Sequence, residues 1–269
     1  MLTRFLPTWL DAFRDRSGLI LSLARRDVAS RYHGTLLGSV WVFLAPLLML
    51  LVYTFVFGHI LKARWGGDQS TTAFALTLFS GLLLNSLLAD CLGRASGVVH
   101  QHSNYVKKLV FPLETLPLSV VLAALTNTVV GYLILLLAMF LLGPAPGWNA
   151  LLLPLALLPF LICVVGLACG VAALGAYFRD VGQIVQFLLV LLLFLSPVLY
   201  PLTSLPPEAR DFLLLNPLTI PVETVRSVLF GSPLPPESQI WSYTLISALI
   251  ALLGVSLFLR VKSGFADVL

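Results

Sequence analysis

Residues 115–178 read TLPLSVVLAALTNTVVGYLILLLAMFLLGPAPGWNALLLPLALLPFLICVVGLACGVAALGAYF, which is a run of 64 residues without one Asp, Glu, Lys or Arg. A single charge at the centre of a membrane helix costs roughly 2.5–3.5 kcal/mol on insertion scales, so such a run is typical of segments that lie in lipid. The turn cluster GPAPGWN at residues 143–149 divides the run into two parts. Each part is longer than the about 20 helical residues that cross a bilayer core. The run therefore predicts two membrane-spanning helices.

The remainder of the chain is also poor in charge. The protein is 59% hydrophobic and 10% charged, whereas ordinary soluble domains contain about 25% charged residues. Further charge-poor windows complete a predicted set of six spans, at residues 36–61, 72–92, 116–142, 150–177, 182–202 and 240–260. In a soluble helical protein these helices would show polar faces to water, and the six windows have none. The sequence therefore predicts an all-α, polytopic membrane protein with its transmembrane domain at residues 36–260.

Basic residues collect on one side of the predicted bilayer. With the N-terminus in the cytoplasm, the inner segments hold twelve Lys and Arg residues and the outer segments hold four. Cytoplasmic loops of membrane proteins carry this excess, so we expect both termini in the cytoplasm. The formal net charge of +4 is accordingly a topology signal. No nucleic-acid partner is expected, because that partner would need a basic face on a soluble domain.

The two ends of the chain are expected to lie outside the bilayer core. Residues 1–35 are predicted to form one or two amphipathic helices in the cytoplasmic interface, since apolar side chains recur at helical spacing opposite Arg and Asp side chains. This pattern fits a plain membrane anchor, and it also fits a docking platform that transmits motion from a cytoplasmic partner. Residues 261–269 are predicted to form a cytoplasmic tail.

Two loops are too long to be plain connectors. The inner loop at residues 94–114 mixes charged and aromatic residues, and we expect it to form a short helix across the cytoplasmic face and to contact a partner. The proline-rich outer loop at residues 200–239 contains two apolar stretches, at 212–222 and 220–230, that are too short to span. They are expected to form short re-entrant or interfacial periplasmic helices, the second with a polar side that carries Glu223 and Arg226. An ordinary folded extracellular loop is the alternative.

The sequence lacks the motifs of several kinds of active site. The dipeptide Gly-Lys occurs nowhere, which excludes a P-loop for ATP, and neither H-E-x-x-H nor G-x-S-x-G is present. Cys91, Cys163 and Cys169 lack metal-ligand spacing and are expected to pack as small apolar residues, so no metal site is predicted. Proton- or sodium-coupled transport is disfavoured, because such carriers keep ionisable residues near the membrane midplane. The best candidate for such a residue, Asp90, lies at the cytoplasmic end of its span. The chain is not expected to be an enzyme, and energy for active transport must come from another chain.

Two pairs of glycines have the small-x-x-x-small spacing that lets membrane helices approach closely. They are Gly34 with Gly38 at the first span and Gly166 with Gly170 in the fourth. Such pairs bring helix backbones together, and we expect both to mark packing within one subunit.

Seven short segments follow one another in a characteristic order along nearly the whole chain. They are Arg26-Asp27-x-x-x-Arg31-Tyr32 with Leu37-Gly38-x-x-Trp41 and Pro46, Tyr53-Thr54-Phe55-Val56-Phe57-Gly58, Asn104-Tyr105-Val106-Lys107-Lys108-Leu109-Val110-Phe111-Pro112-Leu113-Glu114, Tyr177-Phe178-Arg179-Asp180-Val181, Ser196-Pro197-Val198-Leu199-Tyr200-Pro201, Leu215-Asn216-Pro217-Leu218 and Phe265-Ala266-Asp267. In this order they resemble the permease subunits of ABC transporters that export polysaccharides such as O-antigen.

The resemblance implies a permease that exports lipid-linked polysaccharide across the bacterial inner membrane, with O-antigen favoured over capsule or teichoic acid. It implies a homodimer that binds two copies of a separate cytoplasmic ATPase subunit. ATP and Mg would be held by that subunit, and this chain would bind no cofactor. The implied ATPase contact consists of Arg26, Asp27, Arg31, Asn104, Tyr105, Lys107 and Lys108. The implied periplasmic gate consists of Ser196, Pro197, Tyr200, Asn216 and Pro217.

Aromatic residues on two spans are candidates for the lining of a polysaccharide pathway. Sugar C–H faces stack on aromatic rings, and repeated weak stacking lets a polymer slide. Tyr53 and Phe57 lie one turn apart on the first span, and Phe187 and Phe194 lie seven residues apart on the fifth. Positions facing lipid or the core are the alternative for these rings.

Two other functions stay open, namely an ABC permease for a drug or other small molecule and an ATP-independent lipid channel or scramblase.

Overall fold

The computed structural model describes residues 16–60, 70–106 and 111–265 of the 269-residue chain. Within these ranges the regular elements are all helices. Five helical segments are long and apolar enough to cross a membrane, namely Gly38–Phe57, Thr72–Ala95, Thr115–Leu142, Trp148–Tyr177 and Glu237–Gly264. The prediction of an all-α, polytopic membrane protein is confirmed.

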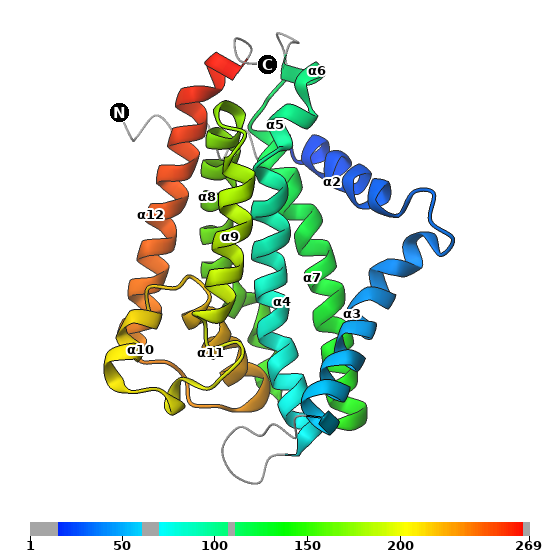
Figure 1. The fold of residues 1–269 in the computed structure, drawn as a ribbon, viewed down its shortest axis with the longest axis vertical. Helices are drawn as coiled ribbons and strands as arrows, with labels where there is room; N and C mark the ends of the chain where they lie inside the picture. The colour runs from blue at the N-terminus through cyan, green and yellow to red at the C-terminus, as the bar shows by residue number, and fades with distance from the viewer. Residues whose placement is uncertain (1–15, 61–69, 107–110, 266–269) are drawn as a thin grey trace.

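Four long helices run side by side and form the body of the bundle (Figure 1). They are α4 (Thr71–Ala95), α7 (Thr115–Leu142), α8 (Leu153–Tyr177, preceded by the turn η3 at Trp148–Leu152) and α12 (Glu237–Val261, followed by the turn η5 at Lys262–Gly264). The helix α4 contacts both α7 and α8, and 72% of its most apolar window is buried inside the protein. It is therefore the centre of the hydrophobic core.

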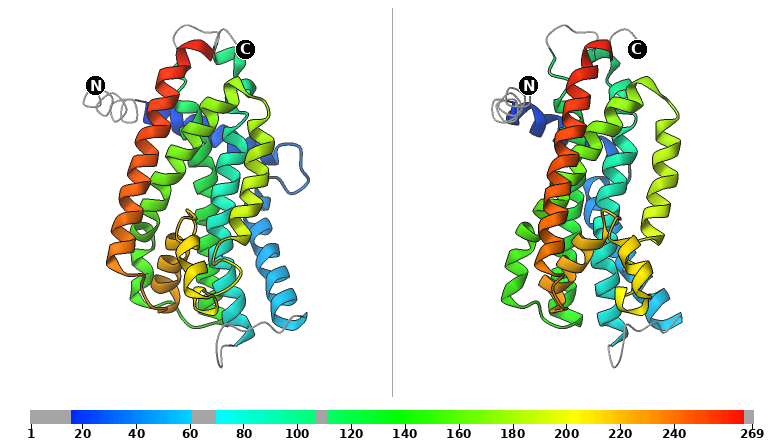
Figure 2. Two further views of the ribbon diagram at one scale, coloured as in Figure 1. Left: turned by 60° about the vertical axis from the view of Figure 1, so that its left-hand side comes forward. Right: turned by 90° about the vertical axis from the view of Figure 1, so that its left-hand side faces the viewer.

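The first span packs loosely and its preceding helix lies crosswise. α3 (Trp41–Tyr53) continues the turn η1 (Gly38–Val40) and passes into the π-helical segment η2 (Thr54–Ile60), and only 6% of the span's apolar window is buried. Most of its residues therefore remain partly or fully exposed and can contact lipid or a partner chain. α2 (Ser17–Tyr32) lies across one end of the bundle and contacts α7 (Figures 1 and 2). This is the orientation expected of an interface helix.

The two ends of the bundle differ in charge. We call one of them the basic end, because α2, α5 (Val98–Gln101), α6 (Ser103–Val106) and the last turn of α12 lie there (Figure 1). Its described basic residues are Arg16, Arg25, Arg26, Arg31, Arg94, Arg179, Arg260 and Lys262. At the opposite end, where α10 (Pro207–Leu213) and α11 (Thr219–Phe230) lie, the described basic residues are Arg210 and Arg226.

One of the two glycine pairs brings helices together. A Cβ at Gly166 would lie 2.5 Å from the Ala251 Cα, and a Cβ at Gly254 would lie 1.9 Å from the Gly166 carbonyl oxygen, so α8 and α12 touch through their backbones. The expected close packing within one subunit is therefore confirmed at Gly166. The expectation was wrong for Gly34 and Gly38, whose φ angles are +81° and +51° and whose added Cβ atoms would meet nothing within 4 Å. They form the turn between α2 and α3, where positive φ favours glycine.

The fifth predicted span is shorter than residues 182–202. α9 (Val181–Phe194) has 14 residues, about 21 Å of helix, whereas the hydrocarbon core is about 30 Å thick. The helix ends before Ser196-Pro197, because proline provides no backbone N–H to continue it. The chain then turns back toward the bundle before it has covered the length of a full span.

Short helices follow in the outer loop. They are the turn η4 (Leu202–Ser204), α10 (Pro207–Leu213) and α11 (Thr219–Phe230), which lie together at the end opposite α2 (Figures 1 and 2). The predicted piece at 220–230 is the helix α11. The predicted piece at 212–222 is wrong as a helix, because α10 ends at Leu213 and the segment around Asn216-Pro217 is a turn.

Matched alanine substitutions on α8 test the backbone contact with α12. Gly166→Ala would place a methyl group against the Ala251 backbone, whereas Gly170→Ala would place one 3.8 Å from the Gly254 Cα, an ordinary contact distance. We expect Gly166→Ala to lower the free energy of unfolding by about 1–3 kcal/mol, as overpacked interiors do, and Gly170→Ala to change it little. Thermal unfolding in detergent measures both variants. Equal stability of the two would contradict the contact.

Candidate functional site

Four charged side chains form an ion-pair network at the basic end. Asp27 and Arg31 come from α2, and Asp90 and Arg94 come from the last turns of α4. Arg31 Nη1 lies 2.9 Å from Asp90 Oδ2, Arg94 Nε lies 2.8 Å from Asp90 Oδ1, and Arg94 also pairs with Asp27. Arg94 Nη2 donates a further hydrogen bond of 3.1 Å to the Val120 carbonyl oxygen of α7. The network thus ties α2, α4 and α7 together.

The arrangement of this network follows from local spacing. Asp27 and Arg31 are four residues apart on α2, and Asp90 and Arg94 are four apart on α4, so each pair lies on one face of its helix. The four side chains retain between 22% and 33% of their exposure, and two positive charges meet two negative charges. Balanced charge lowers the cost of placing these groups beside the apolar bundle. The network can therefore hold α2 in place without a net buried charge.

A second contact joins the start of α2 to the end of α12. The Glu114 carboxylate, whose side chain is 10% exposed, pairs with Arg16 through Oε1 and with Lys262 through Oε2, the latter at 3.1 Å. Burial by itself raises the pKa of Glu114. A backbone hydrogen bond and the charges of Lys262 and Arg16 outweigh burial and hold this pKa below its ordinary value. Glu114 therefore stays ionised and connects three helices.

The inner loop is docked on the bundle by its first part. Val98 and Val99 of α5 are buried, and His100 Nε2 lies 3.1 Å from the Gly175 carbonyl oxygen of α8. The ring of Tyr105 stacks between His102 and Phe111, with centroid distances of 5.8 and 4.7 Å. The expected single short helix is in fact two, α5 and α6, because the chain breaks helical geometry at His102.

The structure brings part of the predicted ATPase contact together. Arg26 Nη1 donates to the Tyr105 hydroxyl at 3.2 Å, so the middle of α2 and the inner loop meet. Asn104 is exposed beside them. Asp27 and Arg31 instead point into the ion-pair network. Lys107 and Lys108 lie outside the described residues.

Five residues of this end were missed by the sequence reasoning as functional candidates. They are Arg16, Asp90, Arg94, Glu114 and Lys262. The i, i+4 spacing of Asp90 and Arg94 was a usable signal, since acidic and basic residues at that spacing pair on a helix surface. The Glu114 contacts had no local signal, because its partners are 98 and 148 residues away in sequence.

Asn216 of the predicted periplasmic gate holds the end of α9. Its Nδ2 donates to the carbonyl oxygens of Leu192 and Leu195 at 2.8 and 2.9 Å, and its Oδ1 accepts from the Leu218 N–H at 2.9 Å. The carbonyl groups of the last helical turn lack partners within the helix. Asn216 therefore replaces the hydrogen bonds that α9 loses by ending early, and it orients the turn before α11.

The other predicted gate residues lie around the same break. Ser196 is fully buried and its hydroxyl donates to the Leu193 carbonyl oxygen at 2.7 Å. The Tyr200 hydroxyl donates to the Phe194 carbonyl oxygen at 2.9 Å. Pro217 supplies the carbonyl oxygen that accepts from the Tyr243 hydroxyl of α12 at 2.9 Å. The five predicted gate residues thus surround the end of α9, where Pro197 begins the turn.

Arg226, which the sequence placed on the polar side of its helix with Glu223, is a buried part of this assembly. It is 2% exposed, and its guanidinium donates to the Pro197 and Val198 carbonyl oxygens at 2.6 and 3.0 Å and to Glu223 at 3.2 Å. A guanidinium presents several donors in a fixed fork, which suits two neighbouring carbonyl groups. Arg226 thus fastens the turn after α9 to α11.

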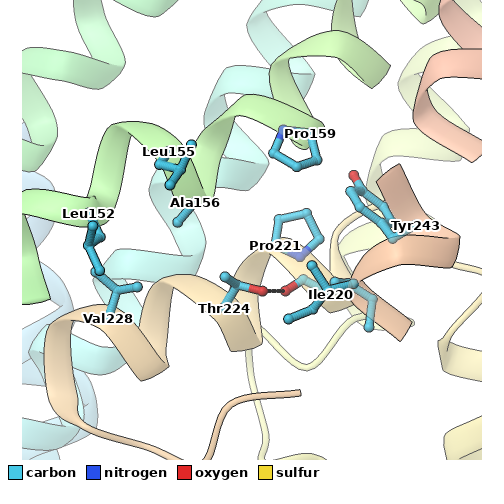
Figure 3. Close-up of a pocket in the computed structure, with 10 residues that line it drawn as sticks. Leu152, Leu155, Ala156, Pro159, Ile220, Pro221, Thr224, Val228 and Tyr243 are labelled. Carbon is cyan, nitrogen blue, oxygen red and sulfur yellow. Dashed lines mark hydrogen bonds between the residues drawn. The ribbon is translucent and has the colours of Figure 1, made fainter. Parts of the chain in front are cut away.

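Beside this assembly, α11 also borders an apolar cavity. The cavity has a volume of about 230 Å³ and is lined by Leu155 and Pro159 of α8, Pro221 and Val228 of α11, and Tyr243 of α12, among others (Figure 3). Its one drawn polar interaction joins the Thr224 hydroxyl to the Ile220 carbonyl oxygen within α11 at 2.7 Å (Figure 3). The lining offers packing surface for the outer helices and no group for chemistry.

The predicted pathway rings form two separate pairs within one chain. Tyr53 and Phe57 contact each other at 6.2 Å between ring centroids, and Phe57 contacts Phe74 of α4 at 6.0 Å, so these rings pack toward the bundle. Phe187 and Phe194 are 69% and 62% exposed on the outer side of α9. Tyr53 also lines a cavity of about 270 Å³ between α3, α4 and α7. The four rings do not line one common surface within a single chain.

Comparison with known proteins gives a consistent set of relatives. A family model for the ABC-2 type transporter matches residues 18–230. The chain is 31% identical over 252 residues to the O-antigen export system permease protein RfbA of Myxococcus xanthus, which covers 93% of this chain and 95% of that protein. It is 27% identical over 244 residues to the polysialic acid transport protein KpsM of Escherichia coli, with coverage of 88% and 91%. It is 22% identical over 251 residues to the capsule polysaccharide export inner-membrane protein CtrC of Neisseria meningitidis serogroup B, with coverage of 91% and 92%.

Replacement of Arg226 tests the fastening of the turn after α9. Arg226→Met keeps the side-chain stem but leaves the carbonyl groups of Pro197 and Val198 without their donor. Each unsatisfied buried group costs about 1–3 kcal/mol, so we expect a clear fall in the thermal unfolding midpoint in detergent. Arg210→Met, which changes an exposed arginine at the same end, is the control and should shift the midpoint little. Equal midpoints for the two variants would disprove the assignment.

The Glu114 contact makes a prediction about pH. Because the folded-state pKa of Glu114 is lowered, its ion pairs contribute stability above the ordinary pKa of about 4.5, and this contribution is lost as the pH falls through the folded value. We expect Glu114→Gln to unfold at a lower temperature than the unaltered protein at pH 7, and the difference to shrink on acidification below pH 4.5. Glu237→Gln, at the exposed start of α12, is the control. A difference that grows in acid would contradict the ion pairing.

Proposed function

We propose that this chain, which belongs to the ABC-2 type transporter family, is the membrane subunit of an exporter of lipid-linked polysaccharide. The observation that carries the proposal is the end-to-end similarity to relatives named for O-antigen, polysialic acid and capsule export. Similarity over nine tenths of both chains includes the spans, the inner loop and the outer helices together. O-antigen is the proposed cargo, because it appears in the name of the relative that is 31% identical.

The proposed energy source is a separate cytoplasmic ATPase subunit. The sequence has no P-loop of its own, and the described spans carry no ion-coupling chain beyond the paired residues of the ion-pair network at the basic end. ATP and Mg would then be bound by the partner subunit, and this chain would bind no cofactor and carry out no catalysis. The twelve-to-four distribution of basic residues supports a cytoplasmic position for the basic end, and thus for both termini, in the inner membrane.

We place the ATPase contact at the basic end. Arg26 of α2 and Tyr105 of the inner loop meet there, and exposed Asn104 lies beside them. Asp27 and Arg31 would support this surface without lying on it, because their ion pairs hold α2 against α4. Lys107 and Lys108, which are next in sequence, complete the proposed contact. A movement of the ATPase subunit against this surface would be transmitted to α4 and α12 by ion pairs and not by a loose loop.

We propose that two copies of the chain enclose one pathway. The exposed surface of α3 and the 69% and 62% exposed rings of Phe187 and Phe194 on α9 are available for this purpose. Tyr53 and Phe57 would join the same lining if α3 turned or a second copy completed it. Ser196, Pro197, Tyr200, Asn216 and Pro217 would then form the periplasmic gate, because the break after α9 lies at the opposite end from the ATPase contact.

The proposal is tested by deletion of the gene in the bacterium that carries it. We expect the surface polysaccharide to be lost and the lipid-linked polymer to accumulate inside the cell, because export and not synthesis is removed. Deletion of the gene for the ATPase partner should give the same result, and the plasmid-borne gene should restore the surface polymer. Chemical analysis of the surface glycan and of the lipid extract measures both. An unchanged glycan with altered sensitivity to a small molecule would support the small-molecule permease instead.

A further inference from the structure

A groove of about 480 Å³ lies beneath α2, where α2, the start of α3 and α7 meet. Its walls combine two kinds of side chain. Leu21, Val28 and Leu122 supply apolar surface, whereas exposed Arg25 and His33 supply polar groups. Figures 1 and 2 show that α2 lies crosswise at this place, so the groove has an interface helix above it and membrane spans beside it.

The groove extends along the bilayer normal. α7 begins at Thr115 near the level of α2, and its two lining residues, Leu122 and Thr126, are seven and eleven residues further along. At 1.5 Å per residue these positions lie about 10 and 16 Å below the start of the helix. Since half of the hydrocarbon core is about 15 Å thick, the groove reaches from headgroup level to the depth of acyl chains in one leaflet.

Among the described residues, Arg25 has no ion-pair partner at this groove. Of the other arginines in and just before α2, Arg16 pairs with Glu114, Arg26 contacts Tyr105, and Arg31 pairs with Asp27 and Asp90. Within residues 16–60, 70–106 and 111–265, Arg25 takes part in no hydrogen bond or ion pair. A cation that borders a partly apolar groove at headgroup depth favours an anionic occupant with an apolar tail.

We propose that this groove binds one anionic phospholipid of the inner leaflet, with its phosphate at Arg25 and His33 and an acyl chain between α2, α3 and α7. Basic pockets between membrane helices on the cytoplasmic side bind anionic headgroups in this way. A guanidinium also pairs well with the planar oxygen pairs of a phosphate. A zwitterionic lipid would also pack against the apolar walls, but because its net charge is zero it would not neutralise the charge of Arg25.

Such a lipid would contact both α2 and α3, which follow each other in the chain and are joined by a turn. That turn contains Gly34 and Gly38, and an added Cβ at either would meet nothing within 4 Å, so these two residues add no close packing between α2 and α3. A bound lipid would fill the angle from below. The proposal uses the orientation given under the proposed function, but it does not depend on which cargo is exported.

The test uses the complete permease–ATPase complex in nanodiscs that contain phosphatidylcholine and phosphatidylglycerol. After release into detergent, native mass spectrometry counts the lipids that each complex retains. We expect the unaltered complex to retain phosphatidylglycerol in preference to phosphatidylcholine. Arg25→Gln should reduce this preference about fivefold, in line with about 1 kcal/mol for each basic residue near an anionic membrane surface. Ala29→Trp, which fills the groove from an exposed position on α2, should reduce the retention of both lipids.

Arg260→Gln is the matched control, because Arg260 is exposed at the same end of the bundle on α12 and does not line the groove. It should retain phosphatidylglycerol like the unaltered complex. Equal loss in Arg260→Gln and Arg25→Gln would overturn the proposal, since it would show a general charge effect. Failure of polysaccharide export leaves this measurement unaffected, because lipid retention is counted without any cargo.

Discussion

The structure depends most on the requirement that every backbone polar group at membrane depth finds a partner within the protein. The requirement is hardest to meet where α9 stops after 14 residues and leaves its last carbonyl groups without helical partners. Asn216 serves the carbonyl groups of Leu192 and Leu195, and Arg226 serves those of Pro197 and Val198. Because both donors come from the outer segment, the short span and the outer helices form one unit. At this break, buried polar side chains replace the missing helical hydrogen bonds.

At the other end of the bundle, ion pairs help to hold the helices together, as apolar packing does in the core. Only Ile20 and Ala24 are buried among the residues of α2, which contacts α7. The ion-pair network of Asp27, Arg31, Asp90 and Arg94 and the pairing of Arg16 with Glu114 add to this contact and help to set the position of the helix. Ion pairs of partly exposed side chains are individually weak and can rearrange. An interface helix held in this way can shift as a rigid rod against α4 and α12, which suits an element that receives movement from a partner subunit.

The two helices with the most free surface differ in what they offer. Only 6% of the apolar window of the first span is buried, although α3 contacts α4 and α7, whereas α9 buries Val185 and Leu189 and exposes Phe187 and Phe194. Membrane helices associate through close packing and not through a hydrophobic driving force between them. The Gly166–Gly254 contact supplies such packing for α8 and α12, which can therefore act as a fixed wall. In the proposed dimer, α3 and α9 would be the elements that border the pathway and α8 with α12 would support them from behind.

The sequence by itself determined the helical class, the five long spans and the basic asymmetry, because charge and hydropathy act residue by residue along the chain. It did not locate the break after α9 or the turn at Asn216-Pro217, because the predicted fifth span ran to residue 202 and the predicted helical piece at 212–222 included the turn, although proline excludes helix geometry locally. Only the tertiary structure decided that α9 ends at Phe194, that Arg226 is buried, and that Gly34 and Gly38 form a turn and not a packing face. It also revealed Glu114 as the link between α2 and α12. These features depend on partners that are distant in sequence, and no local pattern encodes which carbonyl group or carboxylate a long side chain will reach.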